Sequence, residues 1–298
     1  MQGSIMKRGY VVLLFLVIFL TSCSSPSQTP LKISTTTWIG YTPLFYAKEK
    51  GWLEHINVKL VNVVSLSENM YLYEAGNSDA YCGTQYEHSV IKNKVPSLVP
   101  IMLFDRSNGG DIIMSNTSIE DLRNSSKPID TYLEMDSINF TLLNDFIKRY
   151  DIDEKRINYI NRDQAEISVL KNDSPDRQVL IVTYIPYDSR LSKNGFKEIL
   201  STKNGLDLLV VDALFTTKEN LLLHKKQYIQ LKSYVDDALN ALHKNPKEFY
   251  QTIKPYMQEL SYEEFQGSLD DIEWINTTIS KELRDRMRQA SFPTKDLL

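Results

Sequence analysis

The first thirty residues show a different hydrophobic pattern from the rest of the chain. Two basic residues, Lys7 and Arg8, precede an apolar run from Tyr10 to Leu20 and the sequence Leu20-Thr21-Ser22-Cys23. This order of charged, apolar and small residues is typical of a secretory signal peptide. The apolar run is about half as long as a membrane-spanning helix requires. The pattern therefore predicts export rather than a permanent membrane span.

The cysteine that ends this segment is a candidate lipidation site. Leu20-Thr21-Ser22-Cys23 resembles the bacterial lipobox, in which the cysteine becomes the acylated first residue of the mature chain. This resemblance implies a lipoprotein signal peptide over residues 1–22 and acyl chains such as palmitate on Cys23. Residues 23–30 are polar and predict a flexible linker. The alternative is an ordinary signal peptide that is cut elsewhere, with Cys23 discarded.

Strand-like and helix-like segments alternate in the first part of the mature chain. Strands are predicted over 31–36, 56–64, 80–83 and 98–104, and helices over 43–50, 68–75 and 87–92. Thr42 can cap the first of these helices and Gly51 can end it. The alternation predicts an α/β lobe with a largely parallel sheet.

The middle of the chain repeats this alternation, and the last part changes to a helical pattern. Strands are predicted over 129–135, 156–160, 178–184 and 206–211, with a helix over 137–150. The strand at 178–184 lacks alternation, as expected for a strand buried on both faces. Beyond Ala213 the pattern is helical to the end of the chain, and this part is interpreted as scaffold.

Charge and cysteine content exclude several classes of function. Removing residues 1–22 takes away Lys7 and Arg8 and no acid, so the formal net charge moves from −4 to −6. Such an acidic chain is not expected to bind nucleic acid. After Cys23, only Cys82 remains, and it is interpreted as a buried small hydrophobic residue. The four histidines lack metal-binding spacing, so neither a metal nor a cofactor is expected.

Two segments have compositions that suggest a ligand site. Residues 38–43, Trp-Ile-Gly-Tyr-Thr-Pro, lie between a predicted strand and a predicted helix, where ligands of open α/β sheets bind. The alternative is a packed turn with Trp38 in the core. Residues 105–111, Asp-Arg-Ser-Asn-Gly-Gly-Asp, follow an apolar strand. They form either a hairpin turn or a crossing between two lobes.

These segments carry a resemblance to a known family. Residues 38–53 resemble the N-terminal signature of the sulfonate, nitrate, taurine and thiamine-pyrimidine solute-binding proteins of ABC importers. Residues 76–80, 105–111, 118–122 and 129–137 resemble later parts of that family in the same order, and 206–211 resembles its return crossing. The resemblance spans about residues 31–255.

The resemblance implies a type II periplasmic-binding-protein fold, in which two α/β lobes are joined by two crossings around a ligand cleft. Residues 31–110 and 205–298 would form lobe 1, and residues 111–204 would form lobe 2. The implied ligand-binding residues are Trp38, Tyr41, Gly83, Thr84, Asp105, Ser107, Asn108, Glu134, Asp136, Ser137, Tyr184 and Tyr187, with Asp212 as a weaker candidate.

The implied function is that of a monomeric, lipid-anchored solute-binding protein without enzymatic activity, which delivers a small molecule to an ABC permease. The candidate cleft contains Asp105, Glu134, Asp136 and Asp212 but one obvious base, Arg106. Aromatic and acidic side chains favour an amine or a heterocycle over a sulfonate. The alternative is that these acids form salt bridges at the hinge.

Two other functions are compatible with this fold. A ligand-sensing adaptor would dock on a membrane receptor such as a kinase or a cyclic-dinucleotide enzyme, and the neighbouring genes would distinguish it from an importer component. A remote alternative is a thiamine-pyrimidine synthesis enzyme. That branch uses a cysteine-rich motif and an active-site histidine, whereas this chain offers only Cys82 near the predicted cleft.

Overall fold

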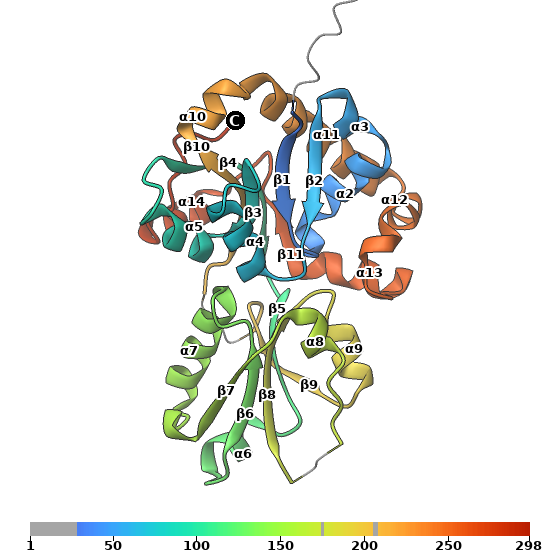
Figure 1. Ribbon diagram of the computed structural model, residues 1–298. Helices are drawn as coiled ribbons and strands as arrows, with labels where there is room; N and C mark the ends of the chain where they lie inside the picture. Colours follow the sequence, from blue (N-terminus) through green and yellow to red (C-terminus); the bar gives the residue numbers. More distant parts are fainter. Residues whose placement is uncertain (1–28, 174–175, 205–207) are drawn as a thin grey trace, which may run out of the picture. The chain divides into compact units, whose positions relative to one another are not determined.

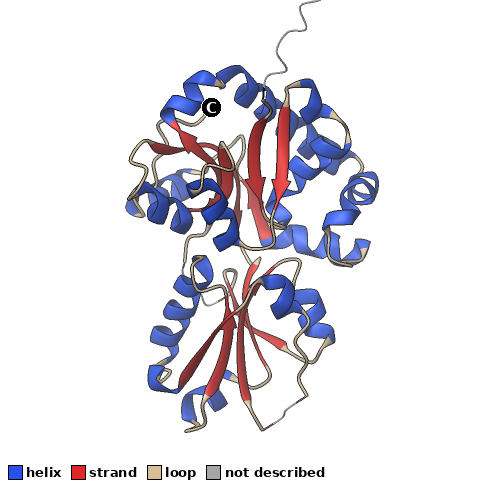
Figure 2. Cartoon of the chain, viewed as in Figure 1, coloured by secondary structure: helices blue, strands red, loops and turns tan. Residues whose placement is uncertain are grey.

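The computed structural model describes residues 29–173, 176–204 and 208–298, and Leu31–Leu298 forms one compact unit. The predicted signal peptide, Cys23 and most of the linker lie outside the described residues. Two separate β-sheets, each covered by helices, form this unit (Figures 1 and 2). We refer to the six-stranded sheet with its helices as lobe 1 and to the five-stranded sheet with its helices as lobe 2.

Lobe 1 contains a mixed sheet with the strand order β11-β4-β10-β3-β1-β2. Its strands are β1 (Leu31–Thr35), β2 (Val58–Asn62), β3 (Ala80–Thr84), β4 (Leu98–Ser107), β10 (Val211–Thr217) and β11 (Ile272–Trp274). Its helices are η1 (Ile39–Tyr41), α2 (Thr42–Glu49), α3 (Trp52–His55), α4 (Leu66–Glu74), α5 (Gln85–Lys92), α10 (Lys218–Leu223), α11 (Lys225–Lys244), α12 (Pro246–Ile253), η3 (Lys254–Tyr256), α13 (Tyr262–Ser268), η4 (Leu269–Asp271) and α14 (Lys281–Gln289).

Lobe 2 contains a mixed sheet with the strand order β7-β6-β8-β5-β9. Its strands are β5 (Asp111–Ser115), β6 (Ile129–Leu133), β7 (Ile157–Asn161), β8 (Gln178–Tyr184) and β9 (Lys197–Ser201). Its helices are α6 (Ile119–Asn124), α7 (Ile138–Tyr150), η2 (Glu154–Arg156), α8 (Gln164–Ser168) and α9 (Asp188–Lys193).

Local sequence signals explain most of these elements. In α7, the Ser137 hydroxyl accepts a hydrogen bond from the Asn139 amide, which caps the helix, and Leu142, Leu143 and Phe146 bury its apolar face. Strand β8 is almost wholly buried between its neighbours, as its continuous apolar run predicts. Gly51 follows α2 with a φ of 73°, the left-handed conformation expected after a helix.

The prediction of a largely parallel sheet was wrong. In lobe 1, β1 pairs in parallel with β2 and β3, but β10 is antiparallel to both β3 and β4, and β11 is antiparallel to β4. In lobe 2, β5 is likewise antiparallel to β8 and β9. The crossings account for β5 and β10, because each of these strands enters its sheet from the other lobe and arrives in the opposite direction. Strand β11 instead comes from the C-terminal helices of lobe 1.

The return strand and the end of the chain also differ from the prediction. The strand expected over 206–211 begins at Val211 and runs to Thr217, inside the part predicted to be helical. Residues 211–216 are all buried, because β10 occupies an interior position in the sheet. The last part of the chain, which was predicted to be helical, also contributes β11.

The start of α2 differs from the prediction as well. Thr42 does not cap α2; it is the first helical residue, and its hydroxyl donates to the Ile39 carbonyl at 2.7 Å.

Two crossings connect the lobes, one from β4 to β5 and the other from β9 to β10 (Figure 1). Residues 105–111 therefore belong to a crossing between lobes, and the hairpin alternative was wrong. The crossings are hydrogen-bonded to one another, because the Ser107 and Thr202 hydroxyl oxygens lie 2.8 Å apart.

Among the described residues, no helix is both long and apolar enough to cross a membrane.

Candidate functional site

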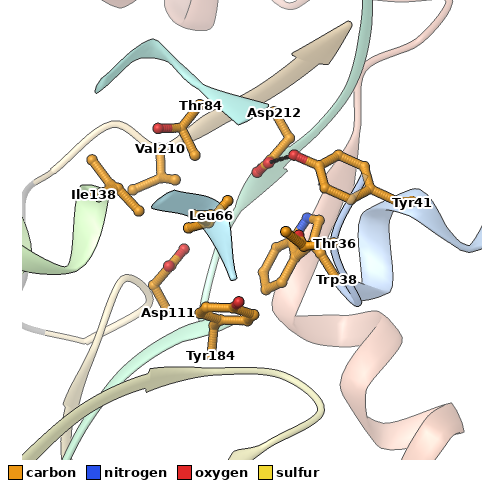
Figure 3. A pocket seen from close by; sticks show the side chains of 10 residues that line it. All are labelled: Thr36, Trp38, Tyr41, Leu66, Thr84, Asp111, Ile138, Tyr184, Val210 and Asp212. Atoms are coloured by element: carbon orange, nitrogen blue, oxygen red, sulfur yellow. Dashed lines mark hydrogen bonds between the residues drawn. The ribbon is translucent and has the colours of Figure 1, made fainter. Parts of the chain in front are cut away.

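A narrow cavity lies between the two lobes (Figure 3). About 260 Å³ of space lies outside the atoms here, part of it open to solvent. Lobe 2 and the first crossing contribute Asp111, Ile138 and Tyr184. The remaining lining residues, from lobe 1 and the return crossing, are Thr36, Trp38, Tyr41, Leu66, Thr84, Val210 and Asp212. The ends of strands from both sheets and the starts of helices from both lobes therefore meet at this cavity.

Trp38 forms one wall of the cavity and is held in place from behind. Its indole N–H donates to the two carboxylate oxygens of Asp105, at 3.2 and 3.3 Å. Its ring meets that of Tyr184 edge to face, with centroids 6.0 Å apart and an interplanar angle of 77°. Because Trp38 follows β1 and Tyr184 ends β8, this aromatic contact joins the two lobes.

Two glycines permit this position of the indole. A Cβ atom added at Gly40 would lie 1.7 Å from an Asp105 carboxylate oxygen, and one added at Gly110 would lie 2.4 Å from the Trp38 ring. Larger residues at either position would displace Trp38 or Asp105. The indole is 4% exposed, so Trp38 packs in the turn, and it also forms a wall of the cavity.

Two buried acids lie next to each other at the base of the cavity. The Tyr41 hydroxyl donates to Asp212, which pairs with Asp105 across β10 and β4 (Figure 3). Burial raises the pKa of Asp212 well above its usual range, and the charge of Asp105 raises it further. Burial also raises the pKa of Asp105, against the lowering effect of the Trp38 hydrogen bond. A charge on Asp105 therefore disfavours a charge on Asp212.

Three polar atoms at the cavity have no hydrogen-bond partner among the described residues. They are Thr36 Oγ1, Asp111 Oδ2 and the Tyr184 hydroxyl. Burial raises the pKa of Asp111 to about 7, although a hydrogen bond with Ser107 partly lowers it. Buried polar atoms without partners are rare in folded proteins. Their concentration around one cavity makes this cavity the candidate ligand site.

Carboxylates from each lobe reach helix starts on the other lobe. Glu134, which follows β6, accepts a hydrogen bond from the Leu66 amide at the start of α4 at 3.0 Å. Glu87, on α5, accepts one from the Ile138 amide at the start of α7 at 3.1 Å. Glu87 also accepts from the Thr84 amide and hydroxyl, at 2.8 and 2.5 Å. These contacts join the lobes on one side of the cavity.

The structure brings some of the predicted site residues to the cavity and places others around it. Trp38, Tyr41, Thr84, Tyr184 and the weaker candidate Asp212 line the cavity; Gly83, Asp105, Ser107, Asn108, Glu134, Asp136, Ser137 and Tyr187 are not among its lining residues.

Most of the predicted residues outside the cavity wall support the lobes or crossings. Ser137 caps α7, and Gly83 is buried within β3. The Asn108 amide donates to the Asp271 carbonyl at 2.9 Å. Asp136 accepts a hydrogen bond from the Tyr71 hydroxyl at 2.6 Å. The Tyr187 ring packs edge to face on the Tyr184 ring, with centroids 5.4 Å apart.

Sequence reasoning missed five lining residues, Thr36, Leu66, Asp111, Ile138 and Val210. Asp111 ends the polar segment 105–111 that already suggested a site, and Ile138 follows the predicted contact Ser137. These neighbouring signals could have identified them. Leu66 and Val210 have no such signal, because each reaches the cavity through the packing of its helix or crossing.

Other groups that suggested chemistry lie away from the cavity wall. Arg106 pairs with Glu273 of β11 at 2.8 Å. Cys82 is fully buried, and burial raises the pKa of its thiol well above the usual range. Burial lowers the pKa of His88 to about 4. Among the described residues, no cluster of three or more His, Cys, Asp or Glu side chains is arranged to hold a metal ion.

The buried acids predict that the stability of the protein without ligand decreases with rising pH. Burial raises the pKa of Glu134 to about 8 and that of Asp111 to about 7, from unfolded values of about 4. For a raised pKa, the stabilisation is complete below the unfolded value and is lost as the pH rises through the folded value. Because one pKa unit corresponds to about 1.4 kcal/mol, we expect the free energy of unfolding to fall by several kcal/mol between pH 5 and 9.

Urea unfolding at a series of pH values measures this effect. Glu134→Gln should flatten the pH dependence, whereas Glu54→Gln, at an exposed position of α3, should leave it unchanged. An unchanged pH dependence in Glu134→Gln would show that Glu134 is ionised in the folded protein without cost. The ion pair with Lys193 lowers the pKa of Glu264 to about 2. Titration of Glu264 therefore changes the stability only at a lower pH and does not contribute between pH 5 and 9.

Comparisons with known proteins identify the fold. A scan against protein-family models finds no match, and a search of curated proteins finds no matching relative. Solved structures do match. The ligand-binding component of an ABC-type import system from Staphylococcus aureus, with zinc bound, is 15% identical with a TM-score of 0.69, and the match covers 90% of this chain and 95% of that one.

Two further structures have the same fold. The alkanesulfonate-binding protein SsuA from Xanthomonas axonopodis pv. citri, bound to MOPS, is 11% identical with a TM-score of 0.69 over 92% of this chain and 99% of that one. A Candida albicans protein described as having the generic periplasmic binding protein fold is 12% identical with a TM-score of 0.65, and the match covers 89% of this chain and 91% of that one. The two-lobed periplasmic-binding-protein fold predicted from the sequence is thus confirmed.

Proposed function

We propose that the protein is an extracytoplasmic solute-binding lipoprotein that captures a small molecule between its lobes and delivers it to an ABC importer. The fold supports this function, because two lobes joined by two crossings can close on a ligand and present a new surface to a membrane partner. The single observation that carries the proposal is the cavity between the lobes, where three polar atoms lack partners.

The charge of the cavity indicates the ligand class. Asp111 and Asp212 line it, and none of its described lining residues is Lys, Arg or His. A cationic ligand would allow Asp111 to ionise and form a charge-assisted hydrogen bond, which is stronger than a neutral one. The faces and edges of Trp38 and Tyr184 suit a protonated amine or a flat heterocycle through cation–π and stacking contacts.

The helix starts beside the cavity argue against an anionic ligand. A helix N-terminus is a general anion-binding position, because its free amides point outward and the helix dipole favours negative charge. In this protein, Glu134 occupies the start of α4 and Glu87 occupies the start of α7. A sulfonate would have to displace a carboxylate from one of these positions. The protein's own acids thus take the place that an anion would need.

A thermal-shift screen tests this ligand class. Primary amines, amidines and protonated nitrogen heterocycles are expected to raise the unfolding temperature, because a ligand that binds only the folded state stabilises it. Sulfonates and nitrate are expected to have no effect. Stabilisation by the anions alone would contradict the ligand class and leave the binding function intact, whereas stabilisation by neither group would count against the binding function as well.

The proposal includes the organisation of the chain. Residues 1–22 act as signal peptide, Cys23 carries the acyl chains, residues 23–30 link the anchor to the body, and the lobes comprise 31–110 with 205–298 and 111–204. Incorporation of labelled palmitate in a bacterial host tests the anchor, and Cys23→Ser should abolish it. Equal labelling of this variant would show that another residue carries the lipid.

An enzymatic function has less support. The described lining residues of the cavity include neither Cys nor His, and Cys82 lies in β3 with a raised thiol pKa. A thiol in that state is a poor nucleophile, because the thiolate is the reactive form. Binding and release without chemical change therefore fit the cavity better than catalysis.

A further inference from the structure

The largest exposed apolar side chains of the described residues gather where α10 meets α11. Leu222 is 73% exposed and Leu223 is 78% exposed, and Ile229 one turn further on is 50% exposed. Lys225 and Lys226 lie between them and are also exposed. We call these five residues the leucine–lysine corner. Within the described part of the chain, no acid forms an ion pair with either lysine.

Side chains next to the corner anchor its backbone to the rest of lobe 1. None of the residues of α10 is buried, yet the next turn is anchored by Tyr228, which is fully buried. The Tyr228 hydroxyl donates to Asn220 at 2.5 Å, and His224 Nδ1 lies 2.7 Å from Gln227 Oε1. The fold therefore directs apolar and basic side chains outward together.

The corner lies at the end of lobe 1 where the described chain begins. The Gln227 side chain donates to the Ile56 carbonyl at 2.8 Å, and the amide of Leu31, the first residue of β1, donates to the Asn57 carbonyl at 3.0 Å. Gln227, which follows Lys226 of the corner, and the start of β1 thus contact the same loop. This end of lobe 1 is opposite lobe 2 (Figure 1), since β1 ends and β10 begins at the cavity.

The length of chain between the candidate acyl site and β1 limits how far this end can be from a membrane. Seven residues lie between Cys23 and Leu31, and the eight steps from one to the other span at most about 3.6 Å each in a fully extended chain, or roughly 29 Å. A surface next to Leu31 is therefore within reach of the bilayer that holds the anchor. A surface at the far end of lobe 2 is not held near it in this way.

We propose that the leucine–lysine corner contacts an anionic lipid bilayer and sets the orientation of lobe 1 on it. This inference rests on the lipid anchor of the proposed function. The two leucines and the isoleucine enter the headgroup boundary, and the two lysines bind the negatively charged surface. Acyl chains give the affinity, and the corner gives the orientation, with the start of β1 next to the bilayer.

Vesicle flotation tests the inference without the anchor. The chain over residues 24–298 contains the whole compact unit and no acyl site. It is expected to bind vesicles of phosphatidylglycerol and phosphatidylethanolamine weakly and phosphatidylcholine vesicles more weakly still. Leu222→Ser with Leu223→Ser, and separately Lys225→Gln with Lys226→Gln, should each lower binding to the anionic vesicles by about tenfold or more.

A matched control uses exposed apolar residues elsewhere. Val64→Ser with Val169→Ser removes two side chains that are 43% and 46% exposed and should leave vesicle binding unchanged. Thermal unfolding should be similar for all variants, which separates lost contact from misfolding. Equal vesicle binding by the wild type and the double serine variant at the corner would overturn the inference.

Two other occupants would also overturn it. If the corner mediates self-association, sedimentation without vesicles will show an oligomer that Leu222→Ser with Leu223→Ser converts to monomer. If it contacts a permease, binding will require proteoliposomes that contain the permease. Because the tested chain carries no acyl group, failure here leaves the anchor untouched, and failure of palmitate labelling at Cys23 is a separate result.

Discussion

Asp111→Asn is expected to lower the affinity for a cationic ligand by about a hundredfold, which corresponds to about 3 kcal/mol. Asp111 has one carboxylate oxygen that is buried without a partner at the cavity, and no basic side chain among the described lining residues competes for it. Asparagine keeps the size of the side chain but cannot carry the negative charge. Isothermal titration with the best amine or heterocycle from the screen measures the loss.

The stability of the same variant distinguishes a binding role from a structural one. Because burial raises the pKa of Asp111, removing the charge should leave the free energy of unfolding at pH 8 unchanged or slightly higher. Asp237→Asn, on the exposed face of α11, is the matched control and should bind like the wild type. Wild-type affinity in Asp111→Asn would contradict the assignment of this acid to the ligand.

Gly40→Ala is expected to lower the free energy of unfolding by about 3 kcal/mol and to weaken ligand binding at the same time. The added Cβ would lie 1.7 Å from Asp105 Oδ2 and 2.5 Å from Trp38 Nε1, so it would separate the hydrogen-bonded pair that positions the indole. Backbone and side chains at η1 would have to move. Urea unfolding measures the stability, and ligand titration measures the effect on the cavity.

The chain offers a matched control for this substitution. At Gly267, in α13, an added Cβ would meet no atom within 4 Å. Gly267→Ala should therefore be neutral or stabilise the protein by up to about 1 kcal/mol, because alanine favours the helix over glycine. If Gly40→Ala is as stable as Gly267→Ala, then the contact of Trp38 with Asp105 is looser than the structure describes.

The sequence predicted most elements because their signals are local. Strand β8 agrees in both bounds with the run of apolar residues at 178–184, and α7 begins after the Ser137 cap. The error at β10 arose because an interior strand shared by antiparallel neighbours has the same apolar composition as a buried helix. Direction within a sheet is set by which lobe the chain comes from, and no local pattern records it.

The candidate site was predictable to a lesser extent. Trp38, Tyr41, Thr84 and Tyr184 reach the cavity as the family resemblance implied, because they sit at strand ends and helix starts. Glu134 was expected to meet the ligand but accepts a hydrogen bond from α4 of the other lobe. A carboxylate at a strand end satisfies either role equally well in the sequence, and only its neighbour in space decides between them.

The sequence by itself determined the acidic balance, the alternating α/β pattern and the candidate export signal, because charge, periodicity and short motifs are properties of adjacent residues. The tertiary structure alone decided which acids face the cavity, since Asp111 and Asp212 come from strands of different sheets that meet only when both crossings are made. It also brought Gln227 of α11 and the start of β1 to the same loop, at residues 56 and 57. Both results depend on contacts between residues more than a hundred positions apart in the chain, which local chemistry does not specify.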